Sequence, residues 1–464
     1  MRNVWPCVFA VVLVGSGAAW GATITVTTTE PGIVEDGLCS LAEAVENAND
    51  GDVNSDCAAA DEGSNIIELG QGETYYQESG DSYLLSRNVT INGNGSTLEA
   101  MNADVGWRGL AFSDDGIIND LTIKDSVTVA IWPLGCCVSL HRCTIRDNTA
   151  GVDLTFGTGP LVIVDSVFSS NEYGIVLDTD YGYVDVIAIN TAFVSNGVAI
   201  FEPDEYPRSR ATLIGCTVND NGSGVVAGAV NLRDSTISNN QSIGVSTSSG
   251  SITGCTVSGN GSGVVLWRWY LENQKSEIEI VATTITGNTH AGIWAAEGGL
   301  FPQVWDGVAF ISDSTVTGNE FGLRGLEEEF KIKNTIIGSN TSNCFWFWET
   351  PGNLSGGFNL TDNNHCQLDH VSDVLVGDVM LSELGNHGGP TPTHMPLEGS
   401  PAIDMVNWEG PCSQMRTDQR GYRRPADGDG DGVAYCDCGA VEAHAVPYEP
   451  PGVPEYPDMP PAHE

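Results

Sequence analysis

Basic residues are scarce in this sequence. Of its 464 residues, 18 are Lys or Arg and 61 are Asp or Glu, which gives a net charge of −43. Nucleic acids and anionic membrane surfaces require a basic patch, so this balance argues against both as partners. It is typical of a secreted protein that meets cationic partners or divalent metal ions. Hydrophobic residues make up 41% of the chain, which is enough for a packed core.

The sequence also lacks an apolar run long enough to span a membrane. The run at residues 5–14 falls far short of the roughly 20 apolar residues that a membrane helix needs. Because it follows Arg2 and precedes Ala19-Trp20-Gly21, it predicts a Sec-type signal peptide over residues 1–21. We therefore expect a protein without a membrane span that is either secreted or held at the cell surface. A protein held at the surface would be associated with an outer membrane.

Paired CxxC motifs are absent, which argues against a structural zinc site. Of the 13 cysteines, Cys7 would leave with the signal peptide, and in an oxidising compartment the others are expected to form disulfides. We predict three bridges from their spacing: Cys39–Cys57, Cys344–Cys366 and Cys412–Cys436. The pairing of the remaining cysteines stays open: Cys136, Cys137, Cys143, Cys216, Cys255 and Cys438.

Helical periodicity is missing from the middle of the chain, where a short unit recurs instead. The unit is T-[IV]-x-x-N followed by Gly and an aliphatic residue, with a mean period of about 24 residues. Its Asn positions are Asn148, Asn171, Asn196, Asn221, Asn240, Asn260, Asn288, Asn319 and Asn340. The segments between them are short, β-branched and alternating, with Asn, Asp, Ser and Gly turns.

Units of this kind cannot bury their own inner faces and must stack on their neighbours. We therefore predict an all-β, right-handed parallel β-helix of about ten coils, in which the Asn amides hydrogen-bond the coils above and below. Cys143, Cys216 and Cys255 precede the same Thr in their repeats, so we expect a buried column of unreactive thiols.

Both ends of the repeat region have sequence features of caps that cover the open ends of a β-helix. Ser40 and Glu43 form a capping box that predicts a helix through Asn49, laid across the first coil. The surrounding residues 39–45 (C-S-L-A-E-A-V) resemble the C-S-L-R-E-A-I signature of bacterial β-helix surface proteins, with Ala42 in the place of Arg. Those proteins are relatives of the polymorphic outer-membrane proteins and the pectate-lyase-like superfamily.

The C-terminal region strengthens this resemblance. Residues 384–394 resemble the family segment L-G-D-N-G-G-P-T-P-T-H, and residues 399–404, 418–421 and 436–442 resemble G-S-P-A-I-D, D-Q-R-G and C-D-I-G-A-Y-E. Together they look like a choice-of-anchor module. We divide the chain into a signal peptide (1–21), an N-terminal cap (22–88), β-helix repeats (89–343), a C-terminal cap with this module (344–443) and a Pro-rich, acidic, disordered tail (444–464).

An acidic loop in the C-terminal module has calcium-loop spacing. Asp427, Asp429 and Asp431 alternate with glycines, as the first positions of a calcium loop require. The Glu expected at position twelve is replaced by Cys438, so Asp437 or Glu442 would have to complete the shell. The alternative is a solvated acidic turn. His387 and His394 lie in the same module and could form a metal-binding pair, but no helix sets their ligand geometry, which favours structural roles.

Four repeats are enlarged in the same phase, at residues 178–185, 202–210, 267–275 and 295–306. The insertions should project from one side of the rod, where their aromatic rings and acids suit carbohydrate recognition. The candidate ligand-binding residues are Trp267, Trp269, Tyr270, Trp294 and Trp305. The alternative is that these rings pack their own loops against the rod.

An enzyme is the second interpretation. Asp178, Asp180, Glu202 and Asp204 could supply the two carboxylates of a glycoside hydrolase. A calcium-assisted polysaccharide lyase would use an arginine base such as Arg208, Arg210 or Arg268. The N-T-D, D-D and G-H-G segments of β-helix galacturonases are missing, as is a G-x-S-x-G motif.

The sequence therefore predicts a monomeric, non-catalytic protein for adhesion or glycan binding. Its expected partners are an extracellular glycan or a surface protein, and calcium is the one cofactor that the sequence suggests.

Overall fold

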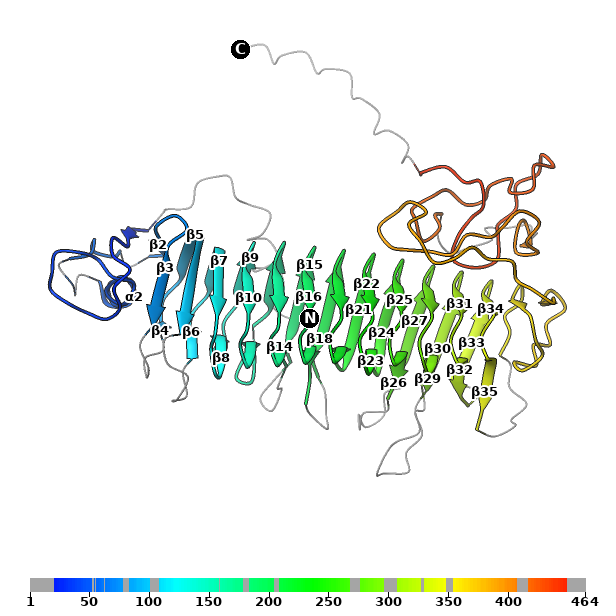
Figure 1. Cartoon of the computed structure of the whole chain (residues 1–464), viewed down its shortest axis with the longest axis horizontal. Helices are drawn as coiled ribbons and strands as arrows, with labels where there is room; N and C mark the ends of the chain where they lie inside the picture. Colours follow the sequence, from blue (N-terminus) through cyan, green and yellow to red (C-terminus); the bar gives the residue numbers. More distant parts are fainter. Residues whose placement is uncertain are drawn as a thin grey trace, which may run out of the picture.

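The computed structural model of the chain is a rod with an irregular module along one side near its C-terminal end (Figure 1). The structure describes residues 21–448 apart from 52, 53, 55, 62, 78–82, 101–107, 158, 178–182, 204–207, 268–275, 296–306, 327–328, 348–353 and 407–415. Most of the predicted signal peptide and of the predicted tail thus lies outside the described residues. Within them, every helix is too short or too polar to cross a membrane.

Each coil of the rod holds three short parallel strands. In one coil these are β15 (Asp185–Ile189), β16 (Ala192–Val194) and β17 (Val198–Phe201), and each pairs in register with its counterpart in the next coil. First and second strands belong to a 25-stranded sheet, and third strands form a 12-stranded sheet. The predicted right-handed parallel β-helix of about ten coils is confirmed.

The same order of strands continues along the rod. The other first strands are β9 (Val138–His141), β12 (Leu161–Val164), β18 (Arg210–Ile214), β21 (Ala229–Arg233), β24 (Ser249–Thr253), β27 (Glu277–Val281), β30 (Val308–Ser312) and β33 (Phe330–Lys333). The other second strands are β10 (Thr144–Arg146), β13 (Val167–Ser169), β19 (Thr217–Asn219), β22 (Thr236–Ser238), β25 (Thr256–Ser258), β28 (Thr284–Thr286), β31 (Thr315–Thr317) and β34 (Ile336–Gly338). The other third strands are β8 (Val129–Pro133), β11 (Ala150–Asp153), β14 (Tyr173–Val176), β20 (Ser223–Val226), β23 (Ile243–Thr247), β26 (Ser262–Leu266), β29 (Ala291–Ala295), β32 (Phe321–Gly325) and β35 (Ser342–Trp346). The ends add β1 (Thr23–Thr25), β2 (Asn65–Glu68), β3 (Thr74–Gln77), β4 (Tyr83–Leu85), β5 (Val89–Ala100), β6 (Arg108–Phe112), β7 (Gly116–Lys124), β36 (Leu360–Thr361) and β37 (Val374–Leu375).

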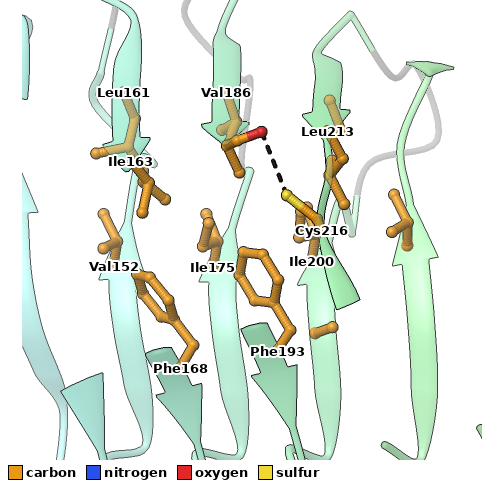
Figure 2. Packing of buried hydrophobic residues seen from close by; sticks show 14 of the residues in the cluster. Val152, Leu161, Ile163, Phe168, Ile175, Val186, Phe193, Ile200, Leu213 and Cys216 are labelled. Atoms are coloured by element: carbon orange, nitrogen blue, oxygen red, sulfur yellow. Dashed lines mark hydrogen bonds between the residues drawn. The ribbon is translucent and has the colours of Figure 1, made fainter. Parts of the chain in front are cut away.

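The core is built from columns of side chains that stack from coil to coil. Val152, Ile175 and Ile200 occupy one register position in successive third strands (Figure 2). Phe168 stacks on Phe193 with their ring centroids 5.1 Å apart. All five side chains are fully buried. Because each coil covers the inner residues of its neighbours, the coils are stable only as a stack.

The repeated asparagines form a continuous buried ladder, as predicted. The Oδ1 atom of Asn221 accepts the backbone N–H of Asn196 at 2.8 Å and its side-chain N–H at 3.0 Å. The Nδ2 atom of Asn221 donates in turn to Asn240 Oδ1 at 2.9 Å and to Phe193 O at 3.0 Å. An amide both donates and accepts, so one residue type satisfies the coils on either side.

A second buried row contains the cysteines. Cys143, Cys216 and Cys255 occupy one turn position of their coils, but Ser and Thr fill the same position in other coils, so the thiols do not form an unbroken column. The N–H of Cys216 donates to Ser235 Oγ at 3.0 Å, and its thiol donates to Ala188 O at 3.3 Å (Figure 2). Burial raises the pKa of the Cys255 thiol to about 12, which makes it unreactive, as predicted.

The N-terminal cap has the predicted helix. In α2 (Leu41–Asp50), the N–H of Glu43 donates to Ser40 Oγ at 3.2 Å, and the N–H of Ser40 donates to Glu43 Oε2 at 2.9 Å. The apolar side of α2 is buried in the rod core.

Two of the predicted disulfides, Cys39–Cys57 and Cys344–Cys366, are present, one near each end of the rod. Cys436 is also disulfide-bonded, whereas its predicted partner Cys412 lies outside the described residues. Cys137 is in a disulfide as well. The other cysteines of the described part are free and buried: Cys136, Cys143, Cys216, Cys255 and Cys438.

The C-terminal module docks on the second strands of the last coils. Thr256, Thr284 and Thr315 are buried there, whereas Thr217, their counterpart in an earlier coil, is exposed. Gln419 spans two coils because its amide donates to Cys255 O at 2.9 Å and accepts from Thr284 Oγ1 at 2.6 Å.

Gly439 lets the module approach the rod closely. Its φ is +98°, and a Cβ at this position would lie 2.9 Å from Thr315 Oγ1. The D-Q-R-G and C-D-C-G segments, which contain Gln419 and Gly439, therefore hold the module on the rod.

A buried ionic network lies in the same interface. Arg424 is 3.4 Å from a carboxylate oxygen of Glu442 and 3.7 Å from one of Asp313, a residue of the rod. Asp437 and the Arg420–Asp418 pair are also buried here, so two guanidinium groups face four carboxylates. Burial away from water raises the pKa of Glu442 to about 8 and that of Asp437 to about 6, and neighbouring carboxylates add to both shifts.

Removal of one ladder amide should destabilise the rod strongly. Asn221→Ala leaves buried N–H groups of Asn196 without an acceptor, so we expect a loss of about 3 kcal/mol or more in the free energy of unfolding. Asn219→Ala, two residues away on the outer side, should cost less than about 1 kcal/mol. Urea unfolding of both variants measures the difference. Equal losses would show that the ladder contributes little.

The ionic network should make stability fall as pH rises. Because the folded pKa of Glu442 is raised to about 8, the folded state holds an extra proton between pH 4.5 and pH 8, and this stabilisation disappears across that window. We expect wild-type protein to be at least about 1 kcal/mol less stable at pH 8.5 than at pH 6. Glu442→Gln should remove most of this difference, and Glu383→Gln, on the surface of the module, should retain it. An unchanged pH profile in Glu442→Gln would contradict the assignment.

Candidate functional site

Aromatic and cationic side chains gather on the outer surface of the third strands near the C-terminal end of the rod. Strand register places Trp294, Arg324 and Phe345 in one row on β29, β32 and β35. Phe321 occupies a second outward position on β32. We call this surface the aromatic face and define it by Trp267, His290, Trp294, Phe321, Arg324, Phe345 and Phe347.

Arg324 lies at the centre of the aromatic face. Its guanidinium carbon is 4.9 Å from the ring centroid of Trp294, 5.4 Å from that of Phe321 and 5.7 Å from that of Phe345. Trp267 extends the face by one coil, with its ring centroid 6.1 Å from that of Trp294. Cation–π attraction of this kind holds the rings in place without a covering layer. The result is a set of neighbouring rings on consecutive coils.

His290 connects the cation to an acid. Arg324 contacts Nε2 of His290, and Nδ1 of His290 lies 3.4 Å from a carboxylate oxygen of Glu320. Because arginine has only donors, Nε2 must accept, and the proton sits on Nδ1 facing Glu320. The side chain of Glu320 is 48% exposed, so its carboxylate can accept hydrogen bonds from a ligand at the edge of the aromatic rings.

The predicted ligand-binding residues are brought together in part. Trp267 and Trp294 are neighbours on the aromatic face, whereas Trp269, Tyr270 and Trp305 lie outside the described residues. Sequence reasoning did not assign Phe321, Arg324 or Phe345 to this surface. The repeat pattern does indicate that Arg324 lies beside Trp294, because both residues occupy the same position after the Gly of the repeat.

Phe345 and Trp346 lie on two different surfaces of the rod. Alternation along β35 turns Trp346 toward Phe330 of the core, with ring centroids 5.6 Å apart. Phe345 is turned outward and 42% exposed. Trp346 thus packs against the core at the end of the rod, while Phe345 belongs to the aromatic face.

Among the predicted catalytic carboxylates, only Glu202 lies in the described part of the chain. Its side chain is buried and accepts from the N–H groups of Arg208 at 2.8 Å and Gly228 at 2.7 Å. Both the N–H and the hydroxyl of Ser209 donate to it as well. Such a carboxylate anchors the chain and is not available for proton transfer to a substrate. Asp178, Asp180 and Asp204, and the proposed base Arg268, lie outside the described residues.

Of the remaining arginine candidates, Arg208 is exposed and Arg210 has structural neighbours. The guanidinium of Arg210 lies 5.6 Å from the ring centroid of Tyr183. Arg210 also stands next to Asp185 in the strand register.

The acidic loop brings together a triad that differs from the predicted one. Carboxylate oxygens of Asp404, Asp427 and Asp429 lie within 4.8 Å of one another. Asp431 accepts the N–H of Val433 at 2.8 Å within the same loop. Asp437 is buried beside the loop and accepts the N–H of Asp404 at 2.8 Å. The oxygen donors of this triad suit a hard cation such as calcium.

The two histidines of the module have structural partners. Nδ1 of His394 lies 2.7 Å from Ser382 O, and its Nε2 lies 3.0 Å from Thr286 Oγ1 on the rod. Burial lowers the pKa of His394, so the neutral ring donates to the carbonyl and accepts from the threonine. Nε2 of His387 lies 3.2 Å from Ser382 Oγ.

No protein-family model and no curated protein sequence matches the chain. Similar solved structures include two mannuronan C-5 epimerase A-modules from Azotobacter vinelandii. AlgE4 is 14% identical with a TM-score of 0.47, over 63% of this chain and 90% of that one. AlgE6 is 14% identical with a TM-score of 0.44, over 64% and 90%. Pectate lyase Pel9A is 13% identical with a TM-score of 0.38, over 92% and 98%. These values assign no activity to the chain.

Proposed function

We propose that the chain is a non-catalytic glycan-binding protein of the cell exterior, which holds a linear polysaccharide on its aromatic face and so serves adhesion. The observation that carries the proposal is the row of Trp294, Arg324 and Phe345 on consecutive coils. Sugar rings stack their C–H faces on aromatic rings, and the spacing of coils, about 4.8 Å, is similar to the length of one sugar unit along a chain.

The polar groups at the edge of the face support the same ligand. Glu320 offers an exposed acceptor, and Arg324 is held among rings beside it. Hydroxyl groups of a sugar can bind to both while its apolar face rests on the rings. The disulfides suit an extracellular protein. Catalysis is not proposed, because Glu202 already has four donors in the described structure.

Loss of Trp294 should weaken glycan binding without unfolding the rod. We expect Trp294→Ala to bind about tenfold more weakly, since one stacking contact contributes about 1.5 kcal/mol. Tyr173→Ala is a matched control, because Tyr173 stacks on Phe201 at 5.2 Å in the same sheet, several coils away. Affinity electrophoresis in pectin, alginate, xylan and glucomannan measures retention, and circular dichroism checks the fold.

The same incubations should be assayed for new reducing ends and for unsaturated uronides. Retention that Trp294→Ala loses and Tyr173→Ala keeps, without cleavage, supports the proposal. Equal retention by both variants would remove the aromatic face as the binding surface. Cleavage of any of these polysaccharides would instead establish the lyase or hydrolase alternative.

We further propose that Asp404, Asp427 and Asp429 bind a calcium ion that stabilises the module. Three carboxylates this close repel one another, and a cation would add to the backbone N–H groups of Gly428 and Gly430, which already offset part of their charge. The loop follows Arg424 and Pro425 in the chain and precedes Asp437, so an ion here would stiffen the segment that docks on the rod.

Calcium should therefore raise the melting temperature. In a thermal scan, millimolar calcium should stabilise the chelator-treated protein by several degrees, as expected for a ligand that binds only the folded state. Asp427→Asn should abolish this shift, and Glu398→Gln, an exposed acid of the same module, should leave it intact. A melting temperature that is independent of calcium would contradict the proposed site.

A further inference from the structure

A groove separates the C-terminal module from the outer surface of the first strands. It has a volume of about 540 Å³ and lies between β18, β21 and β24 on the rod and residues 417–421 of the module. Its size is within the range of small-molecule sites. It lies on a different sheet from the aromatic face, so it is a separate candidate site.

The floor of the groove is a polar row set by strand register. Thr212, Asn231 and Ser251 stand side by side on three consecutive coils. Ser251 donates to Asn231 Oδ1 at 3.3 Å, which leaves the amide N–H groups of Asn231 available. The hydroxyl of Thr212, and that of Thr253 in the neighbouring row, have no hydrogen-bond partner among the described residues. Donors and acceptors thus point into the groove without partners.

The wall of the groove is rigid. Gln419 is fixed to the rod by its amide hydrogen bonds. Arg420 forms two hydrogen bonds to Asp418 Oδ2, at 2.9 Å and 2.7 Å, and its guanidinium carbon lies 4.2 Å from the ring centroid of Tyr422. Because this wall is already ordered before a ligand binds, binding costs little conformational entropy.

The charges that line the groove cancel. Arg233 pairs with Asp234 at 3.2 Å, and Arg420 pairs with Asp418 at 2.7 Å. The groove therefore has no surplus cation, and the chain around it has a net charge of −43. An anionic glycan would be repelled by this field and would gain no compensating ion pair. Ile214, which is 37% exposed, and Pro390 add apolar contact surface at the groove.

We propose that this groove binds a short stretch of a neutral oligosaccharide. The unpartnered hydroxyl and amide groups of Thr212, Asn231 and Thr253 would bind sugar hydroxyls, and Ile214 would contact a sugar C–H face. The site is independent of the aromatic face in position and in the residues that it uses. The module would then act as one wall of a binding site in addition to covering the rod.

Calorimetric titration of the full mature chain tests this inference. The probes are cellohexaose, xylohexaose, mannohexaose and maltohexaose, with hexagalacturonate as the acidic comparison. We expect at least one neutral probe to bind and hexagalacturonate to bind more weakly. The double variant Asn231→Ala/Thr253→Val should weaken the neutral probe about tenfold or more, as expected when about two hydrogen bonds are lost.

Two control variants separate the groove from other surfaces. Glu279→Ala lies in the same outward row one coil further on, at a position that register pairs with Ser251, and should bind the neutral probe normally. The second control is the Trp294→Ala background, in which the aromatic face is weakened: there the double variant should still lower the affinity about tenfold, which distinguishes a failure of the groove from a failure of the aromatic face. The inference is overturned if no neutral probe binds, if the double variant binds as wild type does, or if hexagalacturonate is the preferred ligand.

Discussion

The buried asparagine ladder is the constraint on which the rest of this molecule depends. Each amide must accept from the coil before it and donate to the coil after it, so the coils can stack in only one register. A slip by one residue would leave buried amides unpaired and would turn the core side chains outward. Register in turn decides which side chains share a row on the surface. The ladder asparagines stand at the turn that leads into each third strand. The ladder therefore also fixes the alignment of Trp294, Arg324 and Phe345 on those strands.

The module adds a second constraint, because it bridges several coils at once. Gln419 and His394 hydrogen-bond to consecutive coils, and Gly439 permits the close approach that these bonds require. The buried ionic network around Arg424 lies in this interface, so the stability of the contact depends on the protonation of the network's carboxyl groups. A chain with so many acids can bury some of them only where guanidinium groups or protons offset the charge. The module therefore both covers part of the rod and shapes the groove beside it.

Much of the fold could be predicted from the sequence, because its signals are local and repeated. Three signals of this kind are the Asn positions, the capping box at Ser40 and the spacing of Cys39 and Cys57. Each depends on residues that are neighbours in the chain or that lie on the next coil. The aromatic face could be predicted only in part. Trp267 and Trp294 stand out as aromatic residues near insertions, but Phe345 joins them only through the strand register of β35.

The candidate metal and catalytic residues show the limit of sequence reasoning. Asp404 is distant in sequence from Asp427, and only the fold of the module brings their carboxylates together. Glu202 looked like a free acid in an insertion, yet burial and four backbone or hydroxyl donors hold it as an anchor. Whether an acidic side chain is exposed, paired with a cation or saturated with hydrogen-bond donors depends on tertiary contacts. The residue type alone does not reveal these contacts.

A crystal structure of the full chain with a bound oligosaccharide is the most direct test of the central claim that the rod binds glycan on its aromatic face. The account predicts sugar rings stacked along Trp267, Trp294 and Phe345, with the glycan running parallel to the rod axis and no broken glycosidic bond. A glycan bound only elsewhere on the rod, with these rings uncovered, would contradict it.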